Sequence, residues 1–598
     1  MSSDRAGVWD YLIVTASNER QAQAYRSELD LRARLGRIPQ AKRVLVVADP
    51  GGIRVGSGGS TIACLMRVLE IELSNTARLA DPRAWRETLD RLRILIIHAG
   101  GDSKRLPAYG PCGKIFVPVP AGLWPGPPAS ARAARGAAAR DRLPVTIFDR
   151  LAPIYLGLPA PTSGSHSPAG RIYGHVVIST GDVLLFFDPR RAAFTRGGIT
   201  ALGCLVSPKI SKNHGVFIPD ANGTIRRYLQ KPSVAAQVES GAIFASAKGR
   251  SILDLGVMSF DAAAAVRLLK MCGVGLERKD ATSGGESGLD SEARRRLSWS
   301  GPIAKAVEKW GLDIFREIAC ALGADTEFKG YAEAARAAGS PWDETRLSRV
   351  YKYMHGLDFS LSLLPRCRFL HFGTSRELIS SGNALRRRDR TAAPGDSVIS
   401  LNNAFRGRGR DNRGGRIVGK ESWVEGCRIG AKLTIAGRNV VVGLDIDEPL
   451  ALARGSALDV LKGVDRRGRA VWFVRDYAVD DVFHKPAKRG ACGIRDDRVG
   501  RLAGLPLGEW LEVMGARPDN VWSADVQPNE RQVWNGKFFP AAKRATGFRD
   551  WLWMLEPRKA SPAQKRAWRK ADRYSFAEMA ALADQEAFHA RRASLTIP

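Results

Sequence analysis

The chain has 598 residues and a formal net charge of +31 at pH 7, with 92 Lys and Arg against 61 Asp and Glu. A chain of this length exceeds what a single hydrophobic core supports, so we expect about two to four domains. The positive charge favours anionic partners, but it is spread along the chain, and no zinc-finger, RNA-recognition or helix-turn-helix signature accompanies it. Phosphate-rich substrates therefore explain the charge better than a specific nucleic acid.

Cysteine usage and hydropathy exclude two further classes of protein. The eight cysteines are scattered without a Cys-x-x-Cys pair, which argues against a disulfide framework and against structural zinc. No apolar run approaches the ~20 residues that a membrane-spanning helix needs, and the first residues lack the apolar core of a signal peptide. We therefore expect a soluble, cytoplasmic protein without a membrane partner.

The N-terminal elements alternate between strands and helices. Residues 10–16 and 44–48 are predicted strands, and residues 18–35 are a predicted helix. The second strand leads into the sequence Gly-Ser-Gly-Gly-Ser-Thr at 56–61, and a helix is expected from about 61 to 73. Three readings of this turn stay open: the phosphate loop of a small-molecule kinase, a nucleotide-binding loop of a nucleotidyltransferase, and a packing turn without a ligand. The kinase reading lacks the paired serines that are usual in such loops.

The next strand opens the most informative stretch of the chain. Residues 94–97 are a short, β-branched apolar run, typical of a buried strand in a parallel sheet. The residues that follow are Gly100, Gly101, Ser103, Lys104 and Arg105, and then Lys114 ahead of a second apolar run. In such a turn, backbone N–H groups can approach a phosphate closely while the cations neutralise it. The alternative is a tight turn with solvated cations.

Two later segments place single charged residues at the ends of strands. The apolar segment 175–185 contains Asp182, whose carboxylate is well placed to hold Mg²⁺ against phosphate oxygens. The alternative for this residue is a cap or turn. Residues 215–232 predict a hairpin around an Asn-Gly turn, and its second strand ends at Lys231.

The order of elements predicts an α/β fold. Alternating strands and helices, continued by a strand at 255–261, imply βαβ units and a mainly parallel sheet. Ligands of such sheets bind at the carboxyl ends of strands, where both glycine-rich turns fall. Residues 398–445 carry Ile or Val followed by Gly or Ala about six residues apart, which predicts a β-helix, with an ordinary β-sheet as the alternative.

Two other segments differ in amino-acid composition from the rest of the chain. Residues 121–142 are rich in Ala, Pro, Gly and Arg, and they are expected to form a low-complexity surface insertion. From about residue 500, six tryptophans lie among helical patterns, and we expect them to pack in a core. They are Trp510, Trp522, Trp534, Trp551, Trp553 and Trp568.

The stretch that begins at residue 94 resembles the signature of sugar-phosphate nucleotidyltransferases, Gly-Gly-x-Gly-Thr-Arg-Leu followed by Pro-Lys. It departs from that signature at Ser103, Lys104 and Gly113 and has one residue fewer in the loop. With these departures, residues 98–116 are similar to the fucose-1-phosphate guanylyltransferase family. That family also occurs as the N-terminal half of the bifunctional fucokinase/GDP-fucose pyrophosphorylase. The segments that support the resemblance are 51–61, 371–378 and 534–540.

The resemblance implies a three-part α/β protein and a reaction. Residues 1–380 would form a Rossmann-like nucleotidyltransferase (pyrophosphorylase) sheet, 381–490 a β-helix-like domain, and 491–598 a helical C-terminal region. The family reaction joins GTP and L-fucose 1-phosphate to give GDP-L-fucose and pyrophosphate. A sugar-phosphate oxygen attacks the α-phosphorus in line, so the protein mainly supplies positioning and countercharge, with Mg²⁺ as the expected cofactor.

The resemblance also implies roles for individual residues. Arg105 and Lys114 would be the catalytic cations, Asp182 the metal ligand and Lys231 the contact to the sugar phosphate. The nucleotide would be bound by Gly56, Ser57, Gly58, Gly59, Gly100, Gly101, Ser103 and Lys104. A second metal ligand is not identified, although Asp313 and Asp358 are candidates.

Three alternatives remain at this point. The first is a sugar kinase acting on fucose or a related sugar, and the second is a non-catalytic member of the family that serves assembly. The third is a weak, nonspecific binder of nucleic acid, drawn by the charge. The sugar and the base are inherited from the resemblance alone, and the sequence does not fix the oligomeric state, although a homo-oligomer is compatible with it.

Overall fold

A computed structural model describes residues 8–38, 40–101, 103–120, 143–161, 173–277, 296–391, 397–407, 414–486 and 499–595. The predicted insertion at 121–142 lies outside these residues. The protein is a mixed α/β structure, and the chain divides into two compact units. The first unit comprises Met1–Gly101, Leu151–Gly181 and Leu185–Phe369, and the second comprises Asp102–Arg150, Asp182–Leu184 and Leu370–Pro598.

A nine-stranded sheet forms the centre of the first unit. Its main path has the order β12-β6-β9-β4-β3-β1-β2, and β7 and β8 extend it beside β9. The strands are β1 (Trp9–Ala16), β2 (Ala41–Ala48), β3 (Arg93–His98), β4 (His175–Thr180), β6 (Ile199–Val206), β7 (Gly215–Pro219), β8 (Ile225–Gln230), β9 (Ser251–Phe260) and β12 (Phe359–Leu364). The predicted parallel sheet is confirmed for β2, β1, β3 and β4, which pair in parallel. Beyond β4 the sheet is mixed, because β9 runs antiparallel to both β4 and β6.

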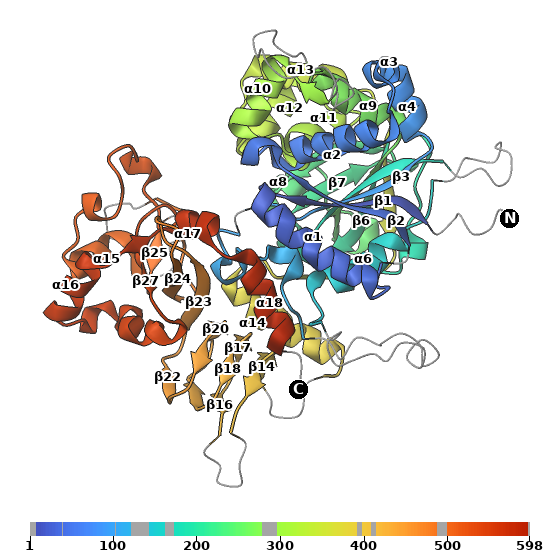
Figure 1. Ribbon diagram of the computed structural model, residues 1–598. Helices are drawn as coiled ribbons and strands as arrows, with labels where there is room; N and C mark the ends of the chain where they lie inside the picture. The colour runs from blue at the N-terminus through green and yellow to red at the C-terminus, as the bar shows by residue number, and fades with distance from the viewer. Residues whose placement is uncertain are drawn as a thin grey trace. The chain divides into compact units, whose positions relative to one another are not determined.

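Helices cover both faces of this sheet, with α1 and α2 on opposite sides (Figure 1). Apolar side chains of α2, among them Leu65 and Leu69, share one buried core with Ile13 of β1 and Ile96 of β3. The helices of the first unit are α1 (Glu19–Arg34), α2 (Gly56–Glu72), α3 (Thr76–Ala80), α4 (Pro82–Leu89), α7 (Pro208–Ser211), α8 (Val234–Glu239), α9 (Ala262–Met271), α10 (Gly301–Trp310), α11 (Cys320–Leu322), α12 (Phe328–Ala337) and α13 (Glu344–Met354). The helix α6 (Ile147–Leu156) contains residues of both units.

One boundary differs from the sequence-based expectation. Helix α2 begins at Gly56, not near 61, because the glycines that suggested a loop form its first turn. The strand predicted to end at Gly181 and Asp182 is confirmed, because β4 ends at Thr180, and a separate strand, β5 (Val183–Phe186), follows. The hairpin β7–β8 and the strand-helix pair β9–α9 agree with the prediction.

Short parallel strands repeat in the second unit. Three sets of strands each pair only in parallel among themselves: β14-β17-β20-β23, β15-β18-β21 and β16-β19-β22. The strands are β14 (Val398–Leu401), β15 (Ala404–Phe405), β16 (Arg416–Gly419), β17 (Ser422–Glu425), β18 (Arg428–Ile429), β19 (Lys432–Ile435), β20 (Val440–Val442), β21 (Asp445–Ile446), β22 (Leu450–Leu452) and β23 (Ser456–Val464). The partner pairs Val424–Val441, Ile429–Ile446 and Leu433–Leu450 are each 17 residues apart, and all six side chains are buried in one core.

The remainder of the second unit continues this sheet and adds helices. Strand β24 (Ala470–Ala478) runs antiparallel to β23, followed by β27 (Phe539–Ala542) and β28 (Arg573–Tyr574). The helices are α14 (Ser375–Arg388), α15 (Leu507–Met514), α16 (Pro562–Lys570), α17 (Phe576–Leu582) and α18 (Gln585–Leu595). The predicted packing role of the tryptophans is confirmed for Trp510, Trp522, Trp534 and Trp568, which are buried. Trp551 and Trp553 are partly exposed.

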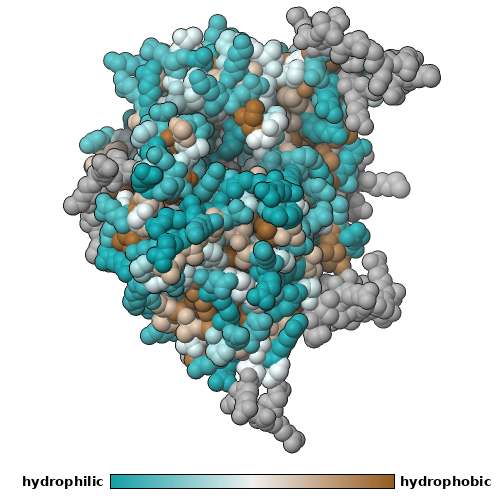
Figure 2. Space-filling model, turned by 60° about the vertical axis from the view of Figure 1, so that its left-hand side comes forward, coloured by the Kyte–Doolittle hydropathy of each residue, from teal (hydrophilic) through white to brown (hydrophobic). Residues whose placement is uncertain are grey.

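Among the described residues, none of the helices has the length and apolar character required to traverse a membrane. The face shown in Figure 2 is mostly hydrophilic, and apolar side chains appear on it in small, separate patches.

Candidate phosphate-binding site

The turn that follows β3 is anchored to the neighbouring strand β1 of the first unit. The Thr15 hydroxyl accepts the backbone N–H groups of Ala99 at 3.1 Å and of Gly100 at 3.3 Å. A Cβ at Gly100 would lie 3.2 Å from the backbone carbon of Ala16, which is tighter than almost all real contacts. Glycine at this position therefore lets β3 and β1 end close together, as a strand-end ligand site requires.

His98, the last residue of β3, is uncharged at neutral pH. Its Nε2 lies 3.1 Å from the Thr61 hydroxyl of α2. Burial among protein atoms lowers the pKa of His98 to about 4, because the charged imidazolium loses its hydration there. The side chain therefore links β3 to α2 as a neutral hydrogen-bonding group.

Beyond Gly101 the chain enters the second unit with a strained backbone. Ser103 is buried and has φ +52°, a left-handed conformation that residues with a Cβ adopt rarely. Its carbonyl accepts the Leu106 N–H at 2.7 Å, and this closes a tight turn with Lys104 and Arg105 at its tip. The general nucleotidyltransferase signature has glycine at position 103, and the left-handed backbone gives the physical reason. The Lys104 ammonium lies 5.6 Å from the ring centre of Trp534.

Lys114 and Asp182 form an ion pair within the second unit. The Lys114 Nζ lies 3.0 Å from the Asp182 Oδ2, and the two side chains are 18% and 37% exposed. The structure therefore brings together two of the residues that the sequence nominated separately. Both groups retain contact with solvent, so each is accessible to a charged ligand.

Arg105 joins this pair beside Gly373. A Cβ built on Gly373 would lie 3.6 Å from the Lys114 Nζ and 3.8 Å from the Arg105 Nη2. Gly373 immediately precedes the N-cap of α14, where the Thr374 hydroxyl accepts the Glu377 N–H at 3.2 Å. The Glu377 carboxylate in turn accepts the Gly373 N–H at 3.0 Å. We call Arg105, Lys114 and the turn at Gly373 the cation cluster.

The surroundings of the cation cluster are electropositive. The pKa of His484 is lowered by burial first, and then by the neighbouring charges of Lys485, Arg105 and Lys104. The helix α14 adds the partial positive charge of its N-terminus. An anion with several negative oxygens would neutralise this charge, so the chemistry of the cluster fits a phosphate or pyrophosphate group.

Sequence reasoning did not assign Gly373 to the site. The segment 371–378 supported the family resemblance but received no role. Its pattern repeats that of the two earlier turns: a strand, here β13 (Arg368–His371), then glycine, then a capped helix. That repetition is the signal in the sequence by which Gly373 could have been found.

Asp182 is the residue that the sequence nominates as a ligand for Mg²⁺. Among the described residues, no three His, Cys, Asp or Glu side chains lie close enough to hold a metal by themselves. Mg²⁺ typically takes one or two protein carboxylates and completes its shell with water and substrate phosphates. A single partly exposed carboxylate beside a phosphate-binding cluster fits that donor set. Asp313 instead caps the turn that follows it, accepting the N–H groups of Phe315 and Arg316.

The glycine-rich turn at the start of α2 has a packing explanation. A Cβ on Gly58 would lie 2.7 Å from the side chain of Leu312, and one on Gly59 would lie 2.7 Å from the side chain of Val55. A Cβ on Gly56 would collide with the Leu312 backbone at 2.4 Å, and the Ser57 hydroxyl accepts the Ile314 N–H. These residues therefore need to be small for packing, and their contact with a nucleotide stays a prediction.

The predicted site residues fall in both units. Gly56, Ser57, Gly58, Gly59, Gly100, Gly101 and Lys231 belong to the first unit, and Ser103, Lys104, Arg105, Lys114 and Asp182 belong to the second. Lys231 is exposed and, like Ser103, adopts a left-handed backbone with φ +51°, while its N–H donates to the His214 carbonyl. Unusual backbone at two nominated positions is typical of functional sites.

An α/β sheet with a glycine turn after a central strand is typical of proteins that bind phosphorylated ligands. An arginine and a lysine close to a helix start fit the same class. The sequence profile of the fucose pyrophosphorylase domain matches residues 86–544. This match covers more than half of the chain. The chain therefore belongs to the fucose pyrophosphorylase family.

Curated relatives agree with this assignment. The chain is 25% identical to the bifunctional fucokinase/GDP-fucose pyrophosphorylase of Arabidopsis thaliana, over 96% of this chain and 51% of the relative. It is 24% identical to the L-fucokinase/L-fucose-1-P guanylyltransferase of Bacteroides fragilis, over 91% of this chain and 47% of the relative. It is 27% identical to the fucose-1-phosphate guanylyltransferase of Homo sapiens, over 40% of this chain and 35% of the relative. The chain thus spans about half the length of the first two.

Proposed function

We propose that this protein joins GTP and L-fucose 1-phosphate to give GDP-L-fucose and pyrophosphate. The observation that carries the proposal is the approach of Arg105 and Lys114 to one glycine turn, with Asp182 paired to the lysine. Membership of the fucose pyrophosphorylase family supplies the sugar and the base. The same chemistry would serve a related sugar 1-phosphate. The proposal therefore concerns first the class of substrate, a sugar 1-phosphate, and second the particular sugar, L-fucose.

The residues of the cation cluster would act through charge and position. A sugar-phosphate oxygen attacks the α-phosphorus of GTP. The bond between the α-phosphorus and the oxygen that bridges it to the β-phosphorus breaks, and pyrophosphate leaves with the negative charge. Lys114 would lie against the α-phosphate, and Arg105 and Lys104 would neutralise the leaving pyrophosphate. A general base is not required, because the attacking phosphate is already ionised at neutral pH.

Asp182 would hold Mg²⁺ in the loaded enzyme. The ion would supply charge neutralisation on the phosphate oxygens. The ion pair with Lys114 sets the position of the carboxylate before any ligand arrives.

The residues of the first unit would bind the rest of the substrates. Gly100 and Gly101, together with Ser103 of the second unit, would contact the triphosphate through backbone N–H groups, and Lys231 would pair with the sugar phosphate. The turn at 56–59 would contact the base or the sugar nucleotide. The Gly100 N–H already donates to Thr15, so this contact would require an exchange of partners.

The finer architecture is also a proposal. We infer that the first part of the chain, residues 1–380, is a Rossmann-like nucleotidyltransferase domain. The strands with a 17-residue repeat would be coils of a β-helix within 381–490, and 491–598 would be a helical tail. A cytoplasmic location and assembly into a homo-oligomer stay predictions of the same kind.

A pyrophosphate-release assay tests the proposed reaction. The purified chain is incubated with Mg²⁺ and one nucleoside triphosphate at a time, together with a panel of sugar 1-phosphates that includes L-fucose 1-phosphate. We expect release of pyrophosphate with GTP and L-fucose 1-phosphate and formation of an equal amount of the sugar nucleotide. Absence of pyrophosphate with every pair of substrates would overturn the proposal.

A sugar kinase is the second candidate, since two of the relatives are named as fucokinases as well as guanylyltransferases or pyrophosphorylases. A kinase would release a nucleoside diphosphate from the free sugar and ATP, and no pyrophosphate. Including free L-fucose with ATP in the same panel separates the two activities. Nucleotide binding without turnover in any arm would instead identify a non-catalytic member of the family.

A further inference from the structure

The last helix of the described chain contacts the loop that carries the catalytic cations. Helix α18 lies beyond residue 544, where the match to the family profile ends. Its Arg592 guanidinium lies over the ring of Tyr109 with 5.5 Å to the ring centre. Its His589 ring meets the ring of Phe116 edge-on, with 6.4 Å between centres. The two loop residues follow Arg105 by four positions and Lys114 by two, so α18 contacts the loop near both cations.

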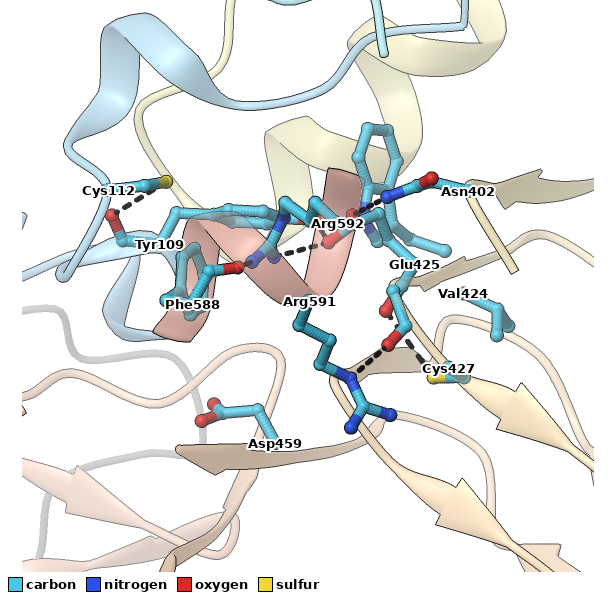
Figure 3. A network of polar contacts seen from close by, with 12 residues as sticks. Tyr109, Cys112, Asn402, Val424, Glu425, Cys427, Asp459, Phe588, Arg591 and Arg592 are labelled. Atoms are coloured by element: carbon cyan, nitrogen blue, oxygen red, sulfur yellow. Dashed lines mark hydrogen bonds and ion pairs between the residues drawn. The ribbon is translucent and has the colours of Figure 1, made fainter. Parts of the chain in front are cut away.

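A buried polar network fixes the contact with Tyr109. Arg592 forms an ion pair with Glu425 of β17 at 2.5 Å, and the two side chains are 6% and 0% exposed. The same Glu425 oxygen accepts the Tyr109 hydroxyl at 3.1 Å, and that hydroxyl accepts the Trp423 indole N–H at 2.7 Å. Figure 3 shows Arg592, Tyr109 and Glu425 converging from a helix, a loop and a strand.

The network is specific because its charges are buried. A buried carboxylate that loses its arginine is left without compensation, so each member depends on the others. The other Glu425 oxygen accepts the Asn402 amide at 3.5 Å. Burial raises the pKa of the Tyr109 hydroxyl well above 10, so it stays protonated and donates to Glu425. Both oxygens of the carboxylate therefore have donors.

The loop itself has few bonds that could set its position. Between Ser103 and Phe116 its backbone hydrogen bonds span three residues, as in Leu106 to Ser103 and Phe116 to Gly113, and a backbone bond to a distant segment follows at Val117, whose carbonyl accepts the Ile147 N–H. The bonds that span three residues shape the short turns but do not fix them relative to the turn at Gly373. The long-range polar contact at Tyr109 and the ring contact at Phe116 supply what local bonds cannot.

We propose that α18 is a positioning element for catalysis, in which Arg592, through Glu425 and Tyr109, holds Arg105 and Lys114 at the turn before α14. This inference rests on the proposed nucleotidyl transfer and assigns a role in it to the end of the chain. Arg592 does not touch the substrate, so it is a positioning residue. Because a displaced cation still attracts the substrate but no longer matches the transition state, its loss should lower kcat more than it raises KM.

A comparison of two adjacent arginines in the full chain tests the role. Arg591 is the matched control, because its guanidinium bonds the Gly426 and Leu444 carbonyls and the Asp445 carboxylate, which all lie outside the loop. We expect Arg592→Met to lower kcat at least 10-fold with KM for the sugar 1-phosphate within about threefold. We expect Arg591→Met to leave kcat within about threefold, whatever its effect on Tm. Equal losses of kcat would make α18 a merely structural element and overturn the proposal.

A labelling experiment gives a readout that does not depend on activity. Lys114 is acetylated with a small reagent, and its modification rate is measured by mass spectrometry in the wild type, Arg592→Met, Arg591→Met and Tyr109→Phe. We expect Lys114 to react severalfold faster in Arg592→Met and Tyr109→Phe, and at the wild-type rate in Arg591→Met. Tyr109→Phe keeps the ring and removes only the hydroxyl, so it decides the matter if Arg592→Met does not fold. Unchanged Lys114 labelling in both variants would contradict the inference, whereas an inactive wild type with the expected labelling would contradict only the proposed reaction.

Discussion

The ammonium nitrogen of Lys114 lies 3.0 Å from a carboxylate oxygen of Asp182. Two residues 68 positions apart in the sequence thus meet at one point of the second unit. Partly exposed pairs of this kind contribute only about 0–1 kcal/mol to stability. The pair is therefore better explained as an arrangement for a ligand than as a support of the fold, and substitutions there should report on chemistry.

Removing either cation should impair turnover. Lys114→Ala or Arg105→Ala removes a positive charge that would face the developing negative charge of the phosphates, and such losses typically lower kcat by about 10²-fold or more. Steady-state kinetics of purified variants measure this. Lys432→Ala, at an exposed position of β19, is the control for the loss of one charge. A kcat near the wild-type value in both test variants would remove these residues from the catalytic machinery.

A methyl group at Gly373 should block the cation cluster without disturbing the fold. The added Cβ would make ordinary contacts, 3.4 Å from the Glu377 carboxylate and 3.6 Å from the Lys114 Nζ. It would nevertheless occupy the space between Lys114 and Arg105 that a phosphate oxygen would take. We expect Gly373→Ala to keep the wild-type Tm and to weaken binding of inorganic pyrophosphate at least 10-fold in calorimetry. Unaltered pyrophosphate affinity would place the anion elsewhere.

Substitution of Asp182 should change the dependence on metal. Asp182→Asn keeps the size of the side chain and its acceptor oxygen, but it removes the negative charge that would attract Mg²⁺. We expect the Mg²⁺ concentration for half-maximal activity to rise at least 10-fold, which a metal titration at fixed GTP measures. The opposite result, an unchanged metal dependence with only a lower kcat, would leave Asp182 as the partner of Lys114 and nothing more.

The sequence was sufficient for local features and insufficient for long-range ones. Strand β3 and the parallel core were predicted from apolar, β-branched runs, because a strand that is buried on both faces needs apolar residues at successive positions. The convergence of Lys114 and Asp182 was proposed only by family resemblance, since no periodicity links residues so far apart. Gly373 was missed although a local signal was present, because a strand, a glycine and a capped helix follow one another there as at the two earlier turns. The sequence did not decide whether the turn at 56–59 contacts a ligand or only packs against other residues. Glycine is suited to both, because the missing side chain lets either a ligand or another part of the chain come close.

Substitution by alanine should change the stability of the protein in opposite directions at two glycines in helices. Gly58 packs against Leu312 in α2, so Gly58→Ala should cost about 1–3 kcal/mol through overpacking. Gly330 lies exposed in α12 with nothing within 4 Å of its Cβ position, so Gly330→Ala should stabilise the helix by about 0.5–1 kcal/mol. Thermal unfolding of the two variants measures the difference. Retention of wild-type stability by Gly58→Ala would contradict the packing role of this turn.

His98 should make stability depend on pH in the acidic range. Its pKa is lowered by burial from 6.5 to about 4 in the folded protein. Above pH 6.5 neither state binds the proton, so the full stability is present there. As the pH falls from 6.5 towards 4, the unfolded state binds a proton at His98 that the folded state does not bind, and stability is lost. The complete loss corresponds to about 3 kcal/mol.

His98→Gln isolates this contribution, because an amide can replace the hydrogen bond to Thr61 but does not titrate. Other buried groups titrate in the same range, so the quantity that counts is the difference in Tm between wild type and variant at each pH. We expect the variant to gain on the wild type steadily from pH 6.5 to pH 4, and the difference to be constant above pH 7. Parallel profiles over the whole range would mean that the pKa of His98 is the same in the folded and unfolded states, and the lowering by burial would then be wrong.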